Sequence, residues 1–150
     1  MGFEGDDFLN CVVWVQSALA PNKVLKKILT IEKRMGRERN KQKRYTSRPI
    51  DIDILLYDDV EIETQKLTIP HPELQNRKFV LQPLAEVNAQ VIHPKLQKNA
   101  VWMLAKTEDT SEVTKLSKWL KNPKKDYTIS KYNYIAIEGN IGAGKTSLAQ

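Results

Sequence analysis

The stretch RPIDIDILLYD, residues 48–58, decides the fold, because it predicts a core strand that carries charge on one face. Apolar and acidic residues alternate in it with the period of two that is typical of a β-strand, which we expect over 49–57. Asp51 and Asp53 share one face, with their Cα atoms roughly 7 Å apart. The residues expected to point the other way, into a core, are Ile50, Ile52, Ile54 and Leu56.

Two neighbouring carboxylates repel each other, so the charge of Asp51 and Asp53 calls for a neutralising partner. Magnesium prefers oxygen ligands and keeps several of its waters in nucleotide sites, which suits such a pair. A solvated strand face carrying two acids explains the same pattern. The alternation alone leaves both interpretations open.

A basic segment leads directly into this strand. Its seven cations are opposed by Glu38 alone, and they are Arg34, Arg37, Arg39, Lys41, Lys43, Arg44 and Arg48. Such a run is typical of a solvated surface or of nucleic-acid contact, but here it can also reach a phosphate held by metal at the acids. Arginine suits phosphate because its planar fork pairs with two oxygens. A loop of this length, with a pivot at Gly36, could close over a nucleotide as a lid.

Hydrophobic periodicity and the residues that typically begin or end helices predict the other elements. We expect a strand over 8–18, in which Phe8, Asn10 and Val12 share a face, and a helix from Pro21 to Gly36. The apolar stripe of that helix comprises Val24, Leu25, Ile28, Leu29 and Met35. A hairpin or edge segment is expected over 60–69, and short helices over 83–89 and 99–106.

Asp109 and Glu112 have the spacing of a capping box, which predicts a further helix. Its apolar face would consist of Val113, Leu116, Trp119 and Leu120. A polar, basic stretch then precedes the short apolar strand YIAIEG, residues 134–139.

Composition narrows the class of protein. The chain has 150 residues with a formal net charge of +6, which favours anionic partners. Cys11 is the only cysteine, so the chain cannot form an internal disulfide or a cysteine-based zinc site, and a cytoplasmic location is expected. No apolar run approaches the roughly 20 residues of a membrane span, so no membrane partner is expected.

RPIDIDILLYD, followed by LTIPHPELQNRKFVLQPLAE, resembles the signature region of the 6-hydroxymethyl-7,8-dihydropterin pyrophosphokinases. The segments FLNCVV and IEKRMGRER fit the same family, and the resemblance runs from about Gly2 to about Leu120. It implies an α+β fold, with a ferredoxin-like antiparallel sheet and packed helices. It also implies pyrophosphoryl transfer from ATP to the pterin alcohol in folate biosynthesis, with release of AMP and without a covalent intermediate.

The resemblance implies a role for each matching residue. Asp51 and Asp53 would hold two Mg²⁺ ions that bridge the ATP phosphates. Catalytic contacts would come from Arg37 and Arg48. The ATP-binding residues would be Arg39, Thr68, His71 and Arg77, and the pterin-binding residues Phe8, Asn10, Tyr45 and Phe79. Without the family, His71 reads as a turn histidine, Arg77 as a surface cation, and Phe8 and Phe79 as core residues.

Two departures from the family affect these expectations. Tyr45 stands where the family usually has tryptophan, so closure over the pterin is expected to differ. The family also begins with a strand, a helix and a second strand before the segment FLNCVV, and this chain shows none of them before Phe8. Residues 1–150 alone are therefore expected to be inactive and marginally folded, with the apolar face of Leu9, Val13 and Val15 short of packing partners.

A second motif lies near the C-terminus. Gly139, Gly144, Lys145 and Thr146 satisfy the phosphate-loop pattern G-x-x-x-x-G-K-[ST], in which backbone amides and the lysine bind phosphate. IEGNIGAGKTSLA resembles the opening of the deoxynucleoside kinases. The expected organisation is a pyrophosphokinase domain over 1–122, a linker over 123–133, and the start of a fused kinase domain over 134–150.

Three functions therefore remain to be separated. The first is pterin pyrophosphorylation, and the second is nucleoside phosphorylation by the downstream unit. The third is non-enzymatic RNA binding through residues 33–48, which would weaken steeply with salt and need no magnesium. The resemblance makes a nucleic-acid partner the least expected of these, with ATP and a pterin alcohol as the expected partners.

Overall fold

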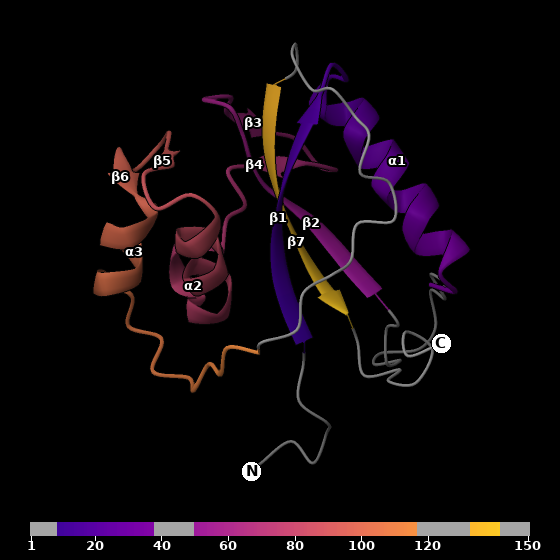
Figure 1. Ribbon diagram of the computed structural model, residues 1–150. Helices are drawn as coiled ribbons and strands as arrows, with labels where there is room; N and C mark the ends of the chain where they lie inside the picture. Colours follow the sequence, from indigo (N-terminus) through magenta and orange to yellow (C-terminus); the bar gives the residue numbers. More distant parts are fainter. Residues whose placement is uncertain (1–8, 38–49, 117–132, 142–150) are drawn as a thin grey trace.

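The computed structural model describes residues 9–37, 50–116 and 133–141, and for the last range the backbone alone. Helices and strands are interspersed along the chain in a mixed α+β architecture (Figure 1). The elements in chain order are β1 (Leu9–Ser17), α1 (Pro21–Arg34), β2 (Ile50–Tyr57), β3 (Ile62–Glu63), β4 (Thr68–Ile69), η1 (Leu74–Asn76), α2 (Lys78–Val87), β5 (Ile92–His93), β6 (Lys98–Asn99), α3 (Ala100–Lys106) and β7 (Asn133–Ile141). The expected α+β class is confirmed.

The main sheet of the described chain has the order β1-β7-β2, with β7 antiparallel to both neighbours. The strands predicted over 8–18 and 49–57 are confirmed as β1 and β2. The strand predicted at 134–139 begins at Asn133 and extends to Ile141. Gly139 thus lies inside β7, opposite Cys11 and Ile52, and not at the start of a turn.

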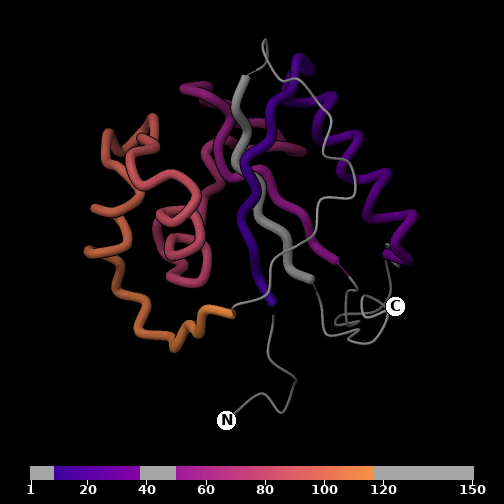
Figure 2. Tube along the Cα trace, viewed as in Figure 1, coloured from indigo at the N-terminus to yellow at the C-terminus, as the bar shows by residue number. Residues whose placement is uncertain are grey.

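Helices cover the two faces of this sheet separately. α1 lies on one side of β1 and β2, and α2 with α3 lies on the other (Figures 1 and 2). The core on the α1 side consists of Val24, Ile28, Ile54, Tyr57 and Ile69. The core on the α2 side consists of Val12, Leu55, Leu56, Leu74, Val80, Leu81, Leu84, Ala100 and Met103.

A β-bulge between Ile54 and Leu56 corrects the predicted alternation of β2. Ile52 and Ile54 face α1 as expected, but Leu56 joins Leu55 in the core on the α2 side. A bulge adds one residue to one strand, so the side-chain alternation shifts beyond it. Before the bulge the alternation holds, and it places Asp51 and Asp53 on the α2 face of the sheet.

The predicted helix between Pro21 and Gly36 is confirmed as α1, with proline in its first turn. Its buried stripe differs from the expected one at the C-terminal end. Met35 is 53% exposed, whereas Glu32 is buried and continues the spacing of Val24 and Ile28 by four residues. A carboxylate therefore occupies a position where the period alone predicts an apolar side chain.

α2 begins five residues before the helix predicted over 83–89, and Pro83 lies inside it. An internal proline costs roughly 3 kcal/mol. Val80, Leu81 and Leu84 are fully buried on the same helix, and each such burial is worth about 1.5–3 kcal/mol. Packing therefore outweighs the proline. The helix predicted over 99–106 is confirmed as α3.

The helix predicted from Asp109 is wrong over the described residues, since 107–116 contains no helix. The Asp109 carboxylate instead accepts hydrogen bonds from the backbone N–H of Ser111, at 2.9 Å, and from that of Lys78, at 2.7 Å. The side chain thus caps the first turn of α2 from 31 positions away. Trp119 and Leu120 lie outside the described residues.

Two smaller predictions agree with the structure. The segment over 60–69 forms the hairpin of β3 and β4, with Ile62 opposite Ile69. The apolar face of β1 is under-packed as expected, because Leu9 is 44% and Val13 38% exposed. Val15 on the same face packs partly against the core on the α1 side.

Candidate functional site

The end of α1 places Arg37 beside the sheet. Gly36 has φ of +88°, a left-handed conformation that glycine adopts without a Cβ penalty. The N–H of Arg37 donates to the carbonyl of Glu32 at 3.0 Å, and that of Gly36 donates to Lys33 at 3.1 Å. This is the Schellman pattern of helix ends. It turns the chain back over the last helical turn, so the Arg37 side chain lies against Glu32.

A chain of charges then links α1 to the acid pair. Arg37 Nη1 donates to Glu32 Oε1 and also, at 2.6 Å, to Asp51 Oδ1. Glu32 Oε1 accepts a further hydrogen bond, at 2.9 Å, from the backbone N–H of Ile52. Arg37 and Glu32 have side chains only 13% and 2% exposed, so their contact is shielded from water, whereas the Asp51 side chain is 32% exposed.

Asp53 belongs to a second charged group, which involves His71. The segment after β4 is fastened to β2 because the N–H of His71 donates to the Leu55 carbonyl at 2.8 Å. His71 Nε2 lies 3.9 Å from Asp53 Oδ2. Burial and the nearby charge of Asp51 raise the pKa of Asp53, while His71 and Arg77 oppose this. Burial lowers the pKa of His71, against the attraction of Asp53.

Arg77 and Phe79 lie at the junction of η1 and α2. The guanidinium carbon of Arg77 is 6.0 Å from the centroid of the Phe79 ring, in the range of a cation–π contact. The positive charge of Arg77 lowers the pKa of both Asp53 and His71. Phe79 also packs against the core on the α2 side.

Sheet register places Asn10 in line with the acids. Asn10 and Asp51 both pair with Asn140 of β7, so they occupy the same row of the sheet two strands apart. Residues in one row point to the same face, and two strand spacings amount to roughly 10 Å. Asn10 therefore shares the α2 face with Asp51 and Asp53. Thr68 lies in β4 opposite Glu63.

Several of the predicted site residues lie outside the described residues. They are Phe8, Arg39, Tyr45, Arg48, Gly144, Lys145 and Thr146. The structure brings together Arg37, Asp51, Asp53, His71, Arg77 and Phe79, with Asn10 in the same row of the sheet. Glu32 is the residue of this network that the sequence interpretation missed. The signal was present, because Glu32 follows Val24 and Ile28 at steps of four on the buried stripe.

Within the described ranges, no group of three or more His, Cys, Asp or Glu side chains lies close enough together to bind a metal ion. The donor set at Asp51 and Asp53 is nonetheless suited to Mg²⁺, which commonly takes one or two carboxylates together with substrate phosphates and waters. Burial and then the repulsion from Asp51 raise the pKa of Asp53, and a cation bound there would relieve that repulsion. None of the helices in this part of the chain has the length and apolar character to cross a membrane.

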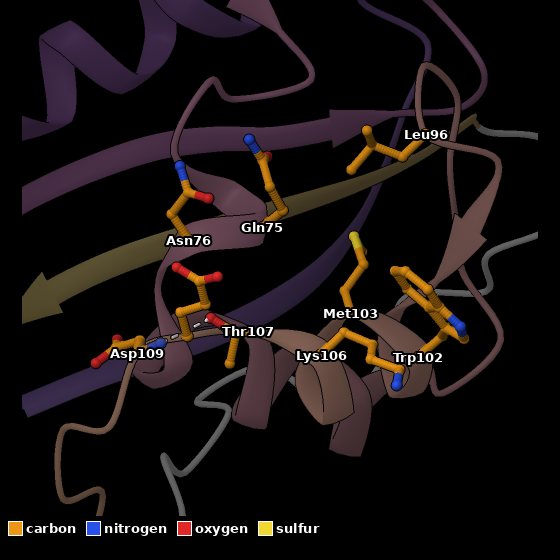
Figure 3. A pocket seen from close by; sticks show the side chains of 9 residues that line it. Gln75, Asn76, Leu96, Trp102, Met103, Lys106, Thr107 and Asp109 are labelled. Atoms are coloured by element: carbon orange, nitrogen blue, oxygen red, sulfur yellow. Dashed lines mark hydrogen bonds between the residues drawn. The ribbon is translucent and has the colours of Figure 1, made fainter.

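A pocket of about 410 Å³ is lined by residues of η1, of α3 and of the segment that follows α3 (Figure 3). Gln75 and Asn76 come from η1, and Trp102, Met103 and Lys106 come from α3. In the figure, Asp109 and Thr107 lie along its lower rim. The described residues that line it include neither Asp51 nor Asp53, so the pocket is distinct from the charged group.

Comparison with known proteins identifies the family. The family model of 7,8-dihydro-6-hydroxymethylpterin-pyrophosphokinase matches residues 1–89, more than half of the chain. That range contains the acid pair, Arg37, Glu32, His71, Arg77 and Phe79. The chain therefore belongs to this pyrophosphokinase family.

Individual relatives agree with the family assignment. The 2-amino-4-hydroxy-6-hydroxymethyldihydropteridine pyrophosphokinase of Aquifex aeolicus is 45% identical over 94 residues, 62% of this chain and 58% of the relative. The enzyme of the same name from Synechocystis is 34% identical over 105 residues, 70% of this chain and 53% of the relative. That of Haemophilus influenzae is 38% identical over 91 residues. The chain spans about half the length of the curated relatives it matches.

Proposed function

We propose that this chain provides the ATP-binding part of a pyrophosphokinase. The enzyme would transfer pyrophosphate from ATP to 6-hydroxymethyl-7,8-dihydropterin and release AMP. The observation that carries the proposal is the group of Asp51, Asp53 and Arg37 on one edge of the sheet, joined by His71 and Arg77. Two acids with interspersed cations suit a metal-bound polyphosphate, whose transfer depends on positioning and charge neutralisation.

Asp51 and Asp53 would hold Mg²⁺, two ions in the arrangement that the family resemblance implies. Bound there, the metal would neutralise charge on the phosphate oxygens. Asp51 Oδ1 accepts a hydrogen bond from Arg37, so the arginine would lie near a phosphate bound through such a metal. Arg37 and Arg48 would then stabilise the charge of the transferred group, while Arg39, Thr68, His71 and Arg77 would bind ATP.

The pterin would occupy the same face of the sheet. Asn10 shares a row of the sheet with Asp51 two strands away, and Phe79 lies beside Arg77, which supports placing the pterin on this face. We propose that Asn10 hydrogen-bonds the pterin edge and that Phe8, Tyr45 and Phe79 enclose its ring. The ferredoxin-like arrangement of the whole sheet belongs to the same proposal.

Product analysis tests this function. The natural full-length protein is incubated with ATP, Mg²⁺ and 6-hydroxymethyl-7,8-dihydropterin, and the nucleotide products are separated. We expect AMP and pterin diphosphate in equal amounts, and no turnover when Mg²⁺ is chelated. ADP as the only nucleotide product would instead indicate transfer of a single phosphoryl group.

We also propose that residues 134–150 open a P-loop nucleoside kinase unit, on the strength of Gly139, Gly144, Lys145 and Thr146. A deoxynucleoside then replaces the pterin in the same assay, and ADP is the expected product. No phosphorylation of any of the four deoxynucleosides would remove this second function. RNA binding by residues 33–48 would show itself as salt-sensitive affinity without nucleotide turnover.

A further inference from the structure

Glu32 occupies a position that is unfavourable for a carboxylate. It lies in the last turn of α1, where the helix dipole is negative and disfavours an acid. Its side chain is also 2% exposed, and burying a charge costs free energy unless the charge is paired. The apolar spacing from Val24 and Ile28 would be continued by leucine or isoleucine at far lower cost. An explanation for Glu32 must therefore come from what its carboxylate holds.

One carboxylate oxygen of Glu32, Oε1, accepts hydrogen bonds from two groups of the proposed site. One is Arg37 Nη1, which also donates to Asp51 at 2.6 Å. The other is the backbone N–H of Ile52, at 2.9 Å, the residue between Asp51 and Asp53. Glu32 thus joins the end of α1 to the strand that carries both acids.

The consequence for Arg37 is a fixed guanidinium. A guanidinium has five N–H donors in a rigid plane, and Nη1 supplies two of them. With both donors of Nη1 engaged, one by Glu32 and one by Asp51, the guanidinium is held at that nitrogen, and the donors of Nε and Nη2 are not used by these two contacts. Anchoring of this kind lowers the cost of placing an arginine against a transferring phosphate.

We infer that Glu32 is a positioning residue, which orients Arg37 and fixes the backbone between Asp51 and Asp53 for phosphate transfer. This inference rests on the proposed function. It predicts that the charge of Glu32 contributes to turnover without touching either substrate. A purely structural role predicts a loss of stability alone.

The test is steady-state kinetics of the full-length Glu32→Gln variant with ATP, Mg²⁺ and the pterin alcohol. Glutamine keeps the shape and an acceptor for the Ile52 N–H but loses the charge that holds Arg37. We expect kcat to fall by about tenfold or more, with the KM for ATP changed less than about threefold. The reason is that Arg37, which Glu32 orients, would contact the phosphate mainly in the transition state. Glu86→Gln removes an exposed helical carboxylate paired with Lys115 and is the control, with unchanged kcat.

A double-mutant cycle with Arg37→Ala decides between positioning and general destabilisation. If Glu32 acts through Arg37, Glu32→Gln has little further effect on kcat in the Arg37→Ala background. Full additivity of the two losses would overturn the inference. So would wild-type kcat in Glu32→Gln, or a change confined to the KM for ATP.

A measurement that needs no turnover separates this inference from the proposed function. Absence of pterin pyrophosphorylation in the wild type would defeat the proposed function alone. Amide hydrogen exchange at Ile52 and the guanidinium NMR signals of Arg37 then report the arrangement directly. In Glu32→Ala, the Ile52 amide should lose protection from exchange, and the guanidinium signals of Arg37 should average as the side chain rotates. Neither change is expected in Glu86→Gln. Unchanged exchange and unchanged signals in Glu32→Ala would overturn the positioning role.

Discussion

Arg37 stands where the end of α1 meets the acid pair, and its guanidinium is shared between Glu32 and Asp51. In the proposed reaction it contacts the phosphate mainly as charge develops. We therefore expect Arg37→Ala to lower kcat by about 10²-fold or more while raising the KM for ATP only modestly, which steady-state kinetics would show.

Arg34→Ala is the matched control for this prediction, because Arg34 is an exposed arginine in the last turn of the same helix. It should turn over like the wild type. If Arg37→Ala kept its kcat and lost only affinity for ATP, Arg37 would be a docking residue and the assigned transition-state contact would be wrong.

The sequence alone predicts the positions of some side chains of the site but not of others. Alternation along β2 was enough to put Asp51 and Asp53 on one face, because strand geometry is local. Glu32 escaped prediction because its role depends on a contact 20 positions away, with Ile52. The grouping of Asp53, His71 and Arg77 likewise required the family resemblance, since three segments separated in sequence meet there only after folding.

At the scale of elements, Gly36 ends α1 and directs Arg37 to the sheet. Its φ of +88° is unfavourable for a residue with a Cβ, although open space surrounds the position. Gly36→Ala should therefore lower the free energy of unfolding by about 1–2 kcal/mol from backbone strain alone. Urea denaturation would measure this loss, and kcat should fall with it because Arg37 is displaced.

A comparison at another residue of the same turn checks the reason. Met35→Ala alters an exposed side chain at the same helix end, without a positive φ, and should leave both stability and kcat near wild type. Equal losses in Met35→Ala and Gly36→Ala would mean that the turn tolerates no change, and that φ is not the cause.

The cap on α2 gives a prediction with a pH dependence. Hydrogen bonds from Ser111 and from the Lys78 N–H hold the pKa of Asp109 below the usual range of an aspartate side chain. A lowered folded-state pKa means that the carboxylate stabilises the protein above its unfolded pKa and loses that effect as pH falls through the folded value. Asp109→Ala should cost about 1 kcal/mol near neutral pH.

The thermal melting temperature measures this cost across pH. The difference between wild type and Asp109→Ala should be full at pH 6 to 7 and shrink below about pH 4. Glu108→Ala, a change at an exposed neighbour, should show no such difference. A gap that stays constant down to pH 2 would show that the charge of Asp109 is not what caps the helix.

Elements set by local signals were predicted well, and those set by distant contacts were not. Pro21 and Gly36 bracket α1 by their own backbone preferences, and β1 follows from its branched residues. α2 was shortened in the prediction because Pro83 looks like a helix start, although buried contacts override it. The prediction of a helix from Asp109 was wrong because that carboxylate accepts a hydrogen bond from the Lys78 N–H, a partner that the local sequence does not reveal.

At the scale of the whole molecule, β7 connects the two motifs of the sequence. It pairs along its length with β1 and carries Gly139 in its interior, opposite Ile52 between the two acids. If the phosphate loop belongs to a separate unit, Lys145→Ala should leave the kcat for pterin pyrophosphorylation within about twofold, because the lysine would serve a different phosphate. Loss of pterin turnover would mean that the C-terminal segment is part of the pyrophosphokinase site.

The measurement that tests the central claim most directly is Mg²⁺-dependent AMP release by the full-length wild type and by Asp53→Ala, with ATP and the pterin alcohol. Removing one metal ligand should abolish turnover, a loss on the order of several kcal/mol of transition-state stabilisation. Asp59→Ala, at an exposed acid just beyond the same strand, should behave as wild type. AMP release by Asp53→Ala at a near-normal rate would contradict the assignment of the acid pair as the centre of the site.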